Sequence, residues 1–427
     1  SRLSKWGPQG GVPKWSDLSE LFSLYQTALK SVSYIDTKIL SEMQQEYRKL
    51  HCMKKGVKDT LDHLKRSDKI ESRAAGWNTF ELKKTDQKAQ VEAVRLAMNG
   101  DWIHGYGYTF ARYNKLKPRL FMPMPYSSML KQAQYFISFL GNIQMDLLSA
   151  KHHSPYVAWS DKIGFDNCFK IMEAEIKNAN LENDETLVYF SNDFEKMDTR
   201  TGPSQYESIF IPILQAAFNH TSDKDIYDSM IFTTTAPIIS PSGTMTGGHG
   251  TASGAEVTNG GESVCNDYFQ RRFLWWLNQL LPSNWRLLSR RFNGDDSALV
   301  FAIRKLDVND FFAKIKQALS NSCDETGFDI QFDKLDISTT YGRYCQNLYY
   351  YDTARNCLVW FYPSVLALNS IVHPEHEYTK ANWDKDYRDL DIIVKLDNLV
   401  NHPAYTKIID YVMKGMKFPL LGNTEPE

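Results

Sequence analysis

The sequence predicts an α+β fold. Residues 15–100 carry apolar residues at helical spacing, residues 186–193 and 291–300 have the composition of strands, and residues 368–427 return to a helical pattern. Helices and strands that come in separate runs are typical of this class.

The composition is that of a globular protein with more than one subdomain. The chain has 427 residues, of which 42% are hydrophobic and 23% charged, enough for two or three subdomains around a substantial core. Its formal net charge of -2 excludes a uniformly basic surface. A nucleic-acid partner would therefore bind in a locally basic channel.

The cysteine spacing and the sequence of the chain ends indicate the cellular compartment. Six cysteines are scattered without a C-x-x-C pair or histidines at zinc-site spacing, so we expect reduced thiols in a cytosolic setting. No apolar run of about 18 residues and no apolar signal core occur, so neither a membrane span nor a secretory peptide is expected. The missing initiator methionine suggests a trimmed or partial chain.

Two basic segments lie in the first third of the chain. The lysines and arginines of residues 48–66 belong to the helical region and are either a solvated helix face, which is the commoner case, or an RNA contact. Residues 105–125 contain glycines, prolines and aromatic residues that break any helix, and this loop has no obvious packing role. Its four crowded cations are Arg112, Lys115, Lys117 and Arg119.

The remaining elements follow from periodicity and turn residues. They are a helix over 131–150, a strand over 186–193, a small-residue flexible stretch over 233–261, a helix over 264–281 stopped by Pro282, a hairpin over 291–300, an amphipathic helix over 307–322, a strand over 327–332 and a hairpin over 346–363.

The chemistry-bearing candidates are carboxylates. In RFNGDDSALV the Asn-Gly-Asp-Asp centre predicts a tight hairpin turn with Asp295 and Asp296 at its tip. Such a turn is more often simply solvated. A third acid, Asp193, ends the strand over 186–193, and acids from separate elements are what a pair of divalent cations requires. We expect Asp193 and Asp295 to bridge two Mg²⁺ ions, Asp198 to accept a hydrogen bond from a bound sugar, and Glu195 to be a surface charge.

The order of these features resembles a known family. A basic loop, an Asp-x4-Asp after a strand, a Ser-Gly loop that opens a long helix and a Gly-Asp-Asp hairpin resemble motifs F, A, B and C of viral RNA-dependent RNA polymerases. The resemblance runs from about Arg112 to the helix after Pro363. The sequence SGAEVT at 253–258, then Ser263 and Asn266, and PSVLALNSIVHPE at 363–375 make it most similar to polymerases of double-stranded RNA viruses of the picobirnavirus kind, with partitiviruses next.

The resemblance implies a right-hand polymerase with fingers, palm and thumb. The palm is an antiparallel sheet with helices. The expected parts are N-terminal fingers with a basic fingertip loop (1–123), a first palm part with motif A (124–203), a fingers insertion (204–245), a second palm part with motifs B to E (246–350) and a thumb (351–427).

It also implies partners and cofactors. We expect an RNA template, a product strand and ribonucleoside triphosphates, with Mg²⁺ as cofactor and Mn²⁺ as a substitute. A viral capsid protein is a further candidate partner, and no membrane is expected. The implied location is the virion interior or the host cytoplasm.

Motif B has two candidate positions. Ser242-Gly243 and Ser253-Gly254 compete, and only the second pair is followed at the family spacing by a threonine, Thr258, and by a helix. The glycine-rich stretch before it, residues 247–250, indicates either a mobile loop or a plain connector. Many family members carry an asparagine nine positions after the serine.

That asparagine helps to recognise the ribose 2′-hydroxyl, and Glu262 stands at its position here. Asn266 lies four residues further along the helix and would share its face. We therefore assign the sugar contact to Asn266 together with Asp198.

Other motifs are implied by the same resemblance. Lys117-Pro118-Arg119 resembles motif F, and its charges, with that of Arg112, would neutralise the incoming triphosphate. Lys334 resembles the motif D lysine that protonates the departing pyrophosphate, although a lysine at such a position is as often merely solvated. Residues 344–348 resemble motif E, which supports the 3′ end of the growing strand.

Two rival functions remain at this point. A reverse transcriptase shares the palm and the paired aspartates, but Asn293-Gly294 precedes the pair where reverse transcriptases usually carry an aromatic residue, and Asp198 favours a 2′-hydroxyl. An RNA-binding or capsid-associated protein that keeps the palm shape without activity is the other rival.

Overall fold

The structure is a computed structural model. It describes residues 12–66, 76–78, 84–114, 117–148, 162–219, 223–253, 255, 257–282, 285–373, 392–397 and 399–414, and the side chains of 112–114, 117, 146–148, 162, 163, 165 and 223 are outside this description. The α-helices are α1 (Ser19–Thr27), α2 (Thr37–Arg48), α3 (Val57–Arg66), α4 (Gln87–Asn99), α5 (Tyr126–Leu148), α6 (Lys162–Asn178), α7 (Met197–Arg200), α8 (Pro203–Gln205), α9 (Ile211–Ala217), α10 (Asp223–Ile231), α11 (Thr258–Leu280), α12 (Val308–Thr326), α13 (Ser364–Val372) and α15 (Tyr405–Met413). The strands are β1 (Gly107–Tyr108), β2 (Phe110–Asn114), β3 (Lys117–Phe121), β4 (Glu185–Ser191), β5 (Ile238–Ser240), β6 (Gly243–Met245), β7 (Trp285–Asn293), β8 (Asp296–Arg304), β9 (Asp336–Ser338), β10 (Gly342–Tyr344), β11 (Asn347–Asp352) and β12 (Cys357–Phe361).

The central sheet has the strand order β7-β8-β4-β9 and is antiparallel throughout. Strand β4 pairs with β8 so that Phe190 lies opposite Leu299. Because successive side chains of a strand point to opposite faces, Val188 and Phe190 face one side of the sheet and Leu187 and Tyr189 the other. The predicted α+β class with an antiparallel sheet is confirmed.

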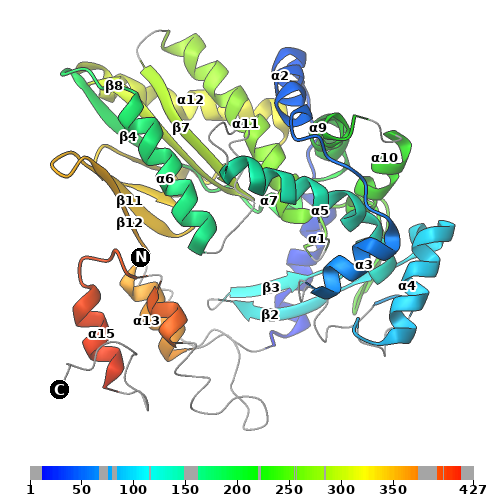
Figure 1. The fold of residues 1–427 in the computed structure, drawn as a ribbon. Helices are drawn as coiled ribbons and strands as arrows, with labels where there is room; N and C mark the ends of the chain where they lie inside the picture. The colour runs from blue at the N-terminus through cyan, green and yellow to red at the C-terminus, as the bar shows by residue number, and fades with distance from the viewer. Residues whose placement is uncertain are drawn as a thin grey trace.

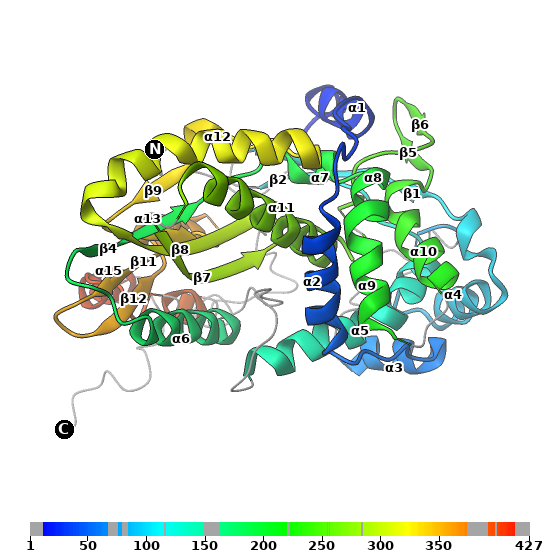
Figure 2. The same ribbon diagram turned by 90° about the horizontal axis from the view of Figure 1, so that it is seen from above.

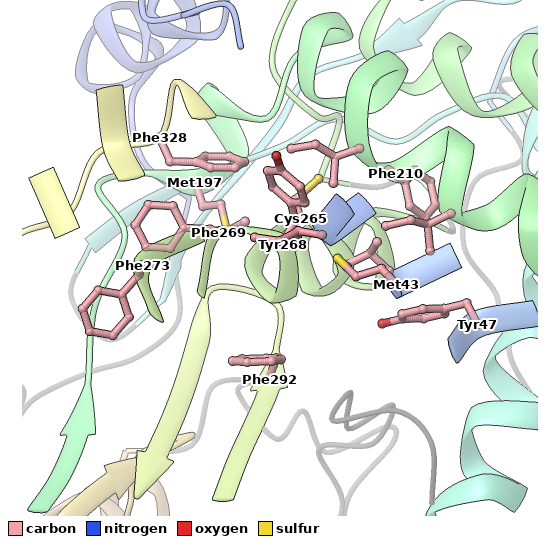
Figure 3. Packing of buried hydrophobic residues seen from close by; sticks show 14 of the residues in the cluster. Met43, Tyr47, Met197, Phe210, Cys265, Tyr268, Phe269, Phe273, Phe292 and Phe328 are labelled. Atoms are coloured by element: carbon pink, nitrogen blue, oxygen red, sulfur yellow. The ribbon is translucent and has the colours of Figure 1, made fainter. Parts of the chain in front are cut away.

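Helices cover both faces of this sheet. Helices α11 and α12 pack on the face that carries Phe190, and α6 packs on the opposite face (Figure 1). The first face forms the larger core, where Phe269 of α11 packs against the rings of Phe194 and Phe328. Phe273, one turn further along α11, stacks on Phe190. Figure 3 shows Phe269, Phe273 and Phe328 in this core. Burial of this apolar surface fixes how α11 lies across the sheet.

In the described part of the chain, three smaller sheets accompany the central one. Strands β10, β11 and β12 form an antiparallel sheet, β2 and β3 form a two-stranded hairpin, and β1, β5 and β6 form a mixed sheet. The hairpin predicted over 346–363 is confirmed by the β11–β12 pair. The basic loop over 105–125 contains the β2–β3 hairpin, which the sequence patterns did not reveal.

The N-terminal segment crosses the molecule before it enters α2. Figure 2 shows α1 beside α7 and α2 between α11 and α9. The buried guanidinium of Arg272 on α11 bonds Asp36, which precedes α2, and Glu325 on α12. These ion pairs join three elements that are far apart in sequence.

Some predicted boundaries were wrong. The helix predicted over 264–281 begins at Thr258 and includes Gly260 and Gly261, whose lack of side chains allows Phe136 and Tyr206 to approach closely. No regular strand forms over 327–332. After the helix ends at Gly327, this segment makes one β-bridge, between Ile330 and Phe194, because backbone bonds with the segment after β4 replace a sheet partner. Helices predicted near the C-terminus are confirmed in α13 and α15, while residues 374–391 and 415–427 lie outside the described part.

Candidate active site

Strand pairing brings Asp193 to the Gly-Asp-Asp hairpin. Asp193 follows the end of β4 at Ser191, and Asp296 is the first residue of β8. Because β4 and β8 are antiparallel neighbours, the end of β4 and the start of β8 lie at the same edge of the sheet. Acids that are about 100 residues apart in the chain therefore belong to one site.

Helix α11 holds the hairpin turn in place. Gly294 has a φ of +61°, as the first central position of a tight hairpin turn requires, and glycine adopts this conformation without strain. Its amide donates to Ser263 Oγ at 2.6 Å, and the Asn266 amide donates to the carbonyls of Gly294 at 3.0 Å and Asp296 at 3.3 Å. The acids thus stand on a turn whose backbone is fixed from behind.

A buried polar cluster links the same turn to β4. The side-chain oxygen of Asn192 accepts hydrogen bonds from Gln270 at 2.8 Å and from Ser297 at 2.7 Å. Asn192 is the residue before Asp193, and all three of these side chains are buried. Bonds among buried polar groups stabilise one arrangement, since any shift would leave a group unsatisfied.

Asp193 forms an ion pair with Lys334. The ammonium lies 3.0 Å from Asp193 Oδ2, and both side chains are more than 40% exposed. Lys334 belongs to a short 3-10 helix (Phe332–Lys334), which the Gln331 amide holds to the Asp193 carbonyl at 2.9 Å. The lysine predicted as a proton donor and the acid predicted as a metal ligand are therefore neighbours.

Asp295 and Asp296 are exposed at the tip but have different surroundings. Desolvation by the surrounding protein raises the pKa of the Asp295 carboxyl, the charges of Asp193 and Asp198 raise it further, and the Arg119 guanidinium lowers it. The Asp296 carboxylate is hydrogen-bonded to the Cys345 thiol in the β10–β11 turn. Asp193, Asp198, Asp295 and Arg119 are thus close enough to interact electrostatically.

The carboxylates do not form a ready-made metal cage. Within the described ranges, no group of three or more histidine, cysteine or acidic side chains is arranged to hold a metal ion. In the structure, one oxygen of Asp193 pairs with Lys334, and Asp296 contacts the Cys345 thiol. The convergence of the three acids around metal ions stays a prediction.

Comparisons with known proteins identify the fold of the chain. No protein-family model matches the sequence. No curated protein matches it either. It is similar in structure to the RNA-dependent RNA polymerase of a human picobirnavirus, with a TM-score of 0.75 and 16% identity over 97% of this chain and 77% of that one. The chain has the right-hand fold of a viral RNA-dependent RNA polymerase. An insertion-loop deletion mutant of that polymerase gives a TM-score of 0.74 and 16% identity over 97% and 79% of the two chains.

In this polymerase fold, Asp198 follows the motif A strand and is bonded within the protein. Its Oδ2 accepts a hydrogen bond from the Tyr25 hydroxyl at 2.5 Å, and its Oδ1 accepts one from the Thr199 amide at 3.0 Å. Tyr25 lies on α1. Its bond to Asp198 was not predicted from the sequence, because the residues of this helix show only the spacing of a core-facing helix. Glu195 is exposed, as predicted.

Glu262 is a second residue whose environment the sequence did not reveal. Its Oε1 is buried and has no hydrogen-bond partner among the described residues. Desolvation raises the pKa of Glu262 well above its ordinary range, and the charges of Asp198 and Asp295 raise it further. The unusual glutamate at this motif B position was the available indication. Glu262 therefore lies within electrostatic range of both Asp198, the sugar-binding candidate, and Asp295 of the hairpin.

The Ser253 segment holds the basic β2–β3 hairpin. Ser253 Oγ donates to the Leu120 carbonyl and accepts from the Met122 amide, both at 3.2 Å. Leu120 directly follows the exposed Arg119 in β3, so the serine fixes the strand that carries this cation. Arg112 lies opposite Arg119 in the hairpin register. The side chains of Arg112 and Lys117, and the residue Gly254, lie outside the described part.

Two predicted motif B contacts have local roles in the structure. Thr258 Oγ1 donates to the carbonyls of Ala252 and Ala255 and thereby stabilises the start of α11. Asn266 is fully buried, and its amide oxygen accepts from Gln270 at 3.1 Å while its nitrogen supports the hairpin turn. Both polar atoms of Asn266 are used within the protein, so this arrangement does not support its assignment as a sugar contact.

The stretch over 247–250 is built into the protein. His249 is buried, and its two ring nitrogens hydrogen-bond the carbonyls of Gly250 and Ala236 at 2.7 and 2.8 Å.

All six cysteines are free thiols, without a disulfide partner. None of the described helices combines the length and the hydropathy needed to cross a bilayer.

Proposed function

We propose that this protein is an RNA-directed RNA polymerase that transfers ribonucleoside monophosphates from nucleoside triphosphates to an RNA 3′-hydroxyl. The observation that carries the proposal is the placement of Asp193 beside the Asp295–Asp296 turn, with Arg119 of the basic hairpin in electrostatic range, in a chain with the right-hand polymerase fold. Phosphoryl transfer by such enzymes depends mainly on positioning and charge stabilisation.

The acids fit divalent metal ions by their chemistry. Carboxylate oxygens are the ligands that Mg²⁺ prefers, and the mutual repulsion of Asp193, Asp198 and Asp295 marks a site with excess negative charge. Asp193, Asp295 and Asp296 would hold the ions, with Mn²⁺ as a substitute. When bound, two ions would activate the 3′-hydroxyl and neutralise charge on the leaving pyrophosphate.

Other residues of this chain would bind the nucleotide and supply a proton. Arg119, with Arg112 and Lys117 on the same hairpin, would neutralise the triphosphate, and Asp198 would accept a hydrogen bond from the ribose. Lys334 would donate a proton to the departing pyrophosphate. Ser253 would act by holding the hairpin that carries Arg119.

The biological setting is proposed on the likeness to a human picobirnavirus polymerase. It is replication and transcription of a double-stranded RNA genome, in the virion interior or the host cytoplasm, with RNA, nucleotides and a capsid protein as partners. The division into fingers (1–123 and 204–245), palm (124–203 and 246–350) and thumb (351–427) is proposed on the same basis.

Primer extension on a defined RNA template tests the activity. We expect the chain to incorporate ribonucleotides with Mg²⁺ or Mn²⁺, and Asp295→Asn to abolish incorporation while RNA affinity stays nearly intact, because RNA binding rests on cations elsewhere. Asp310→Asn, at an exposed position of α12, is the matched control and should retain activity.

Three results would contradict the proposal. Substantial activity of Asp295→Asn would make the Gly-Asp-Asp turn an ordinary acidic turn. A preference for deoxynucleotides on the same template would favour a reverse transcriptase. RNA binding without incorporation by the unaltered chain would favour a palm-shaped binding protein.

A further inference from the structure

Helix α1 supplies the hydrogen-bond donor to Asp198. Tyr25 is 1% exposed, and its ring packs in the same cluster as Leu120 and Met122, which follow Arg119 in the chain. Its hydroxyl donates to Asp198 Oδ2 at 2.5 Å. This bond joins residues that are 173 positions apart in the chain.

Helix α1 is itself tied to the segments around Asp198. The Tyr25 carbonyl accepts from the Gly250 amide at 2.6 Å, the Gln26 amide donates to the Thr246 carbonyl at 2.6 Å, and Arg200 donates to the Ala28 carbonyl at 2.6 Å. Thr246 and Gly250 lie in the segment before motif B, and Arg200 lies in the same short helix as Asp198. Helix α1 therefore contacts motif A and the motif B loop at once.

The backbone of residues 198 and 199 packs tightly against Gly250. A Cβ atom at this position would lie 2.4 Å from the Asp198 carbonyl oxygen, which shows that the motif B loop and the Asp198 segment are in direct contact. A displacement of α1 would therefore disturb both segments together.

The charges around Asp198 make a donor necessary. Glu262 and Asp295 are close enough to Asp198 for mutual repulsion. A carboxylate in such surroundings is held in one orientation only if hydrogen bonds compensate the repulsion. Burial raises the pKa of the Tyr25 phenol well above its ordinary range, so it remains a donor at neutral pH.

We propose that Tyr25 is a positioning residue for nucleotide selection, which fixes the orientation of the Asp198 carboxylate and so acts on ribose discrimination through Asp198. The inference rests on the proposed function, in which Asp198 contacts the ribose. Tyr25 itself is enclosed by protein and acts only through its partner.

Incorporation kinetics with ribonucleotides and deoxynucleotides test this role. Tyr25→Phe removes one oxygen atom and keeps the ring in the core. We expect its ratio of kcat/KM for ribonucleotides to that for deoxynucleotides to fall by about three- to tenfold, as for the loss of one hydrogen bond. Tyr135→Phe is the matched control, since it removes a buried phenol that donates to Asp225 in another part of the molecule, and it should leave the ratio unchanged.

A double variant separates positioning from general loosening. Asp198→Ala should lower the ratio more strongly, and adding Tyr25→Phe to it should lower the ratio no further, because Tyr25 acts through Asp198. An additional loss in the double variant, or an unchanged ratio in folded Tyr25→Phe, would overturn the proposal. Absence of any incorporation by the unaltered chain would instead contradict the proposed polymerase function.

A second substitution decides the question if Tyr25→Phe lacks a cooperative thermal transition. Gln26 is exposed, and Gln26→Ala removes a tie of α1 to the motif B loop without changing the core. This substitution should lower the ratio of kcat/KM for ribonucleotides to that for deoxynucleotides by about twofold, which corresponds to the loss of one exposed hydrogen bond. An unchanged ratio in that variant would then refute the role of α1.

Discussion

The ammonium of Lys334 lies 3.0 Å from a carboxylate oxygen of Asp193. This pairing gives Lys334 two possible roles in the proposed polymerase. It can donate a proton to the leaving pyrophosphate, or it can neutralise Asp193 when no cation is bound. The two roles make different demands, because only the first requires a group that gives up a proton.

Lys334→Arg distinguishes these roles. Arginine keeps the positive charge and can keep the ion pair, but its guanidinium does not deprotonate in proteins. If Lys334 is the acid, kcat for nucleotide addition should fall at least about tenfold in this variant, as general acid catalysis implies. Single-turnover kinetics at saturating nucleotide measure this. Lys177→Arg, which alters the exposed Lys177–Glu173 pair on α6, is the control. A rate close to that of the unaltered chain would limit Lys334 to charge neutralisation.

Arg119→Ala tests the basic hairpin. Because this guanidinium would contact both bound and reacting triphosphate, we expect a higher KM for nucleotides together with a lower kcat. Steady-state kinetics with each of the four ribonucleotides give both constants. Arg355→Ala removes a cation that is 76% exposed in the β11–β12 turn and serves as control. Unchanged values of KM and kcat in Arg119→Ala would show that Arg119 does not act as a motif F residue.

Asn266→Ala tests support of the catalytic turn. The substitution removes the donor to the carbonyls of Gly294 and Asp296, so we expect a loss of about 1–3 kcal/mol in the free energy of unfolding. Activity should fall equally with ribonucleotides and deoxynucleotides, because the turn serves both. Denaturant unfolding and paired incorporation assays measure the two effects.

Asn142→Ala is the matched control for this variant. It deletes an amide that donates to the Leu50 carbonyl at 2.7 Å, so it should cost stability without changing the activity of the folded protein. A loss confined to ribonucleotides in Asn266→Ala would instead restore the sugar contact expected from the sequence.

Asp225 is expected to contribute stability that depends on pH. Burial alone would raise its pKa, but hydrogen bonds from Lys131, Lys54 and Tyr135 lower it from 3.8 to about 2. A depressed pKa in the folded state stabilises the protein above the unfolded-state value, and this contribution is lost as the pH falls from about 4 to about 2.

Asp225→Asn should therefore destabilise the protein at pH 7 and progressively less towards the acid end of that window. Urea unfolding at pH 7 and at pH 3, compared with Asp228→Asn on the same helix, measures the difference. A constant difference between these pH values would show that Asp225 acts without its charge.

Several parts of the site followed from local patterns. The turn that carries Asp295 and Asp296, the strand that precedes Asp193 and most of helix α11 could be predicted, because turn chemistry and apolar periodicity act over a few residues. The order of the motifs along the chain then indicated the polymerase fold, which the structural comparison confirms.

Contacts between distant segments could not be predicted in this way. The start of α11 was missed because its two glycines look like loop residues, while their small size is what lets Phe136 and Tyr206 pack against the helix. Asn266 was assigned to the sugar from its helical spacing, but the packing of α11 against the hairpin directs its amide to the backbone of the turn.

The sequence by itself determined the acids, the cations and the elements that carry them, since each depends on residues that are neighbours in the chain. The tertiary structure alone decided which groups meet: Lys334 with Asp193, and Tyr25 with Asp198. The physical reason is that such bonds form where separately folded helices and strands pack together. No spacing along the chain encodes the position of a side chain 173 residues away.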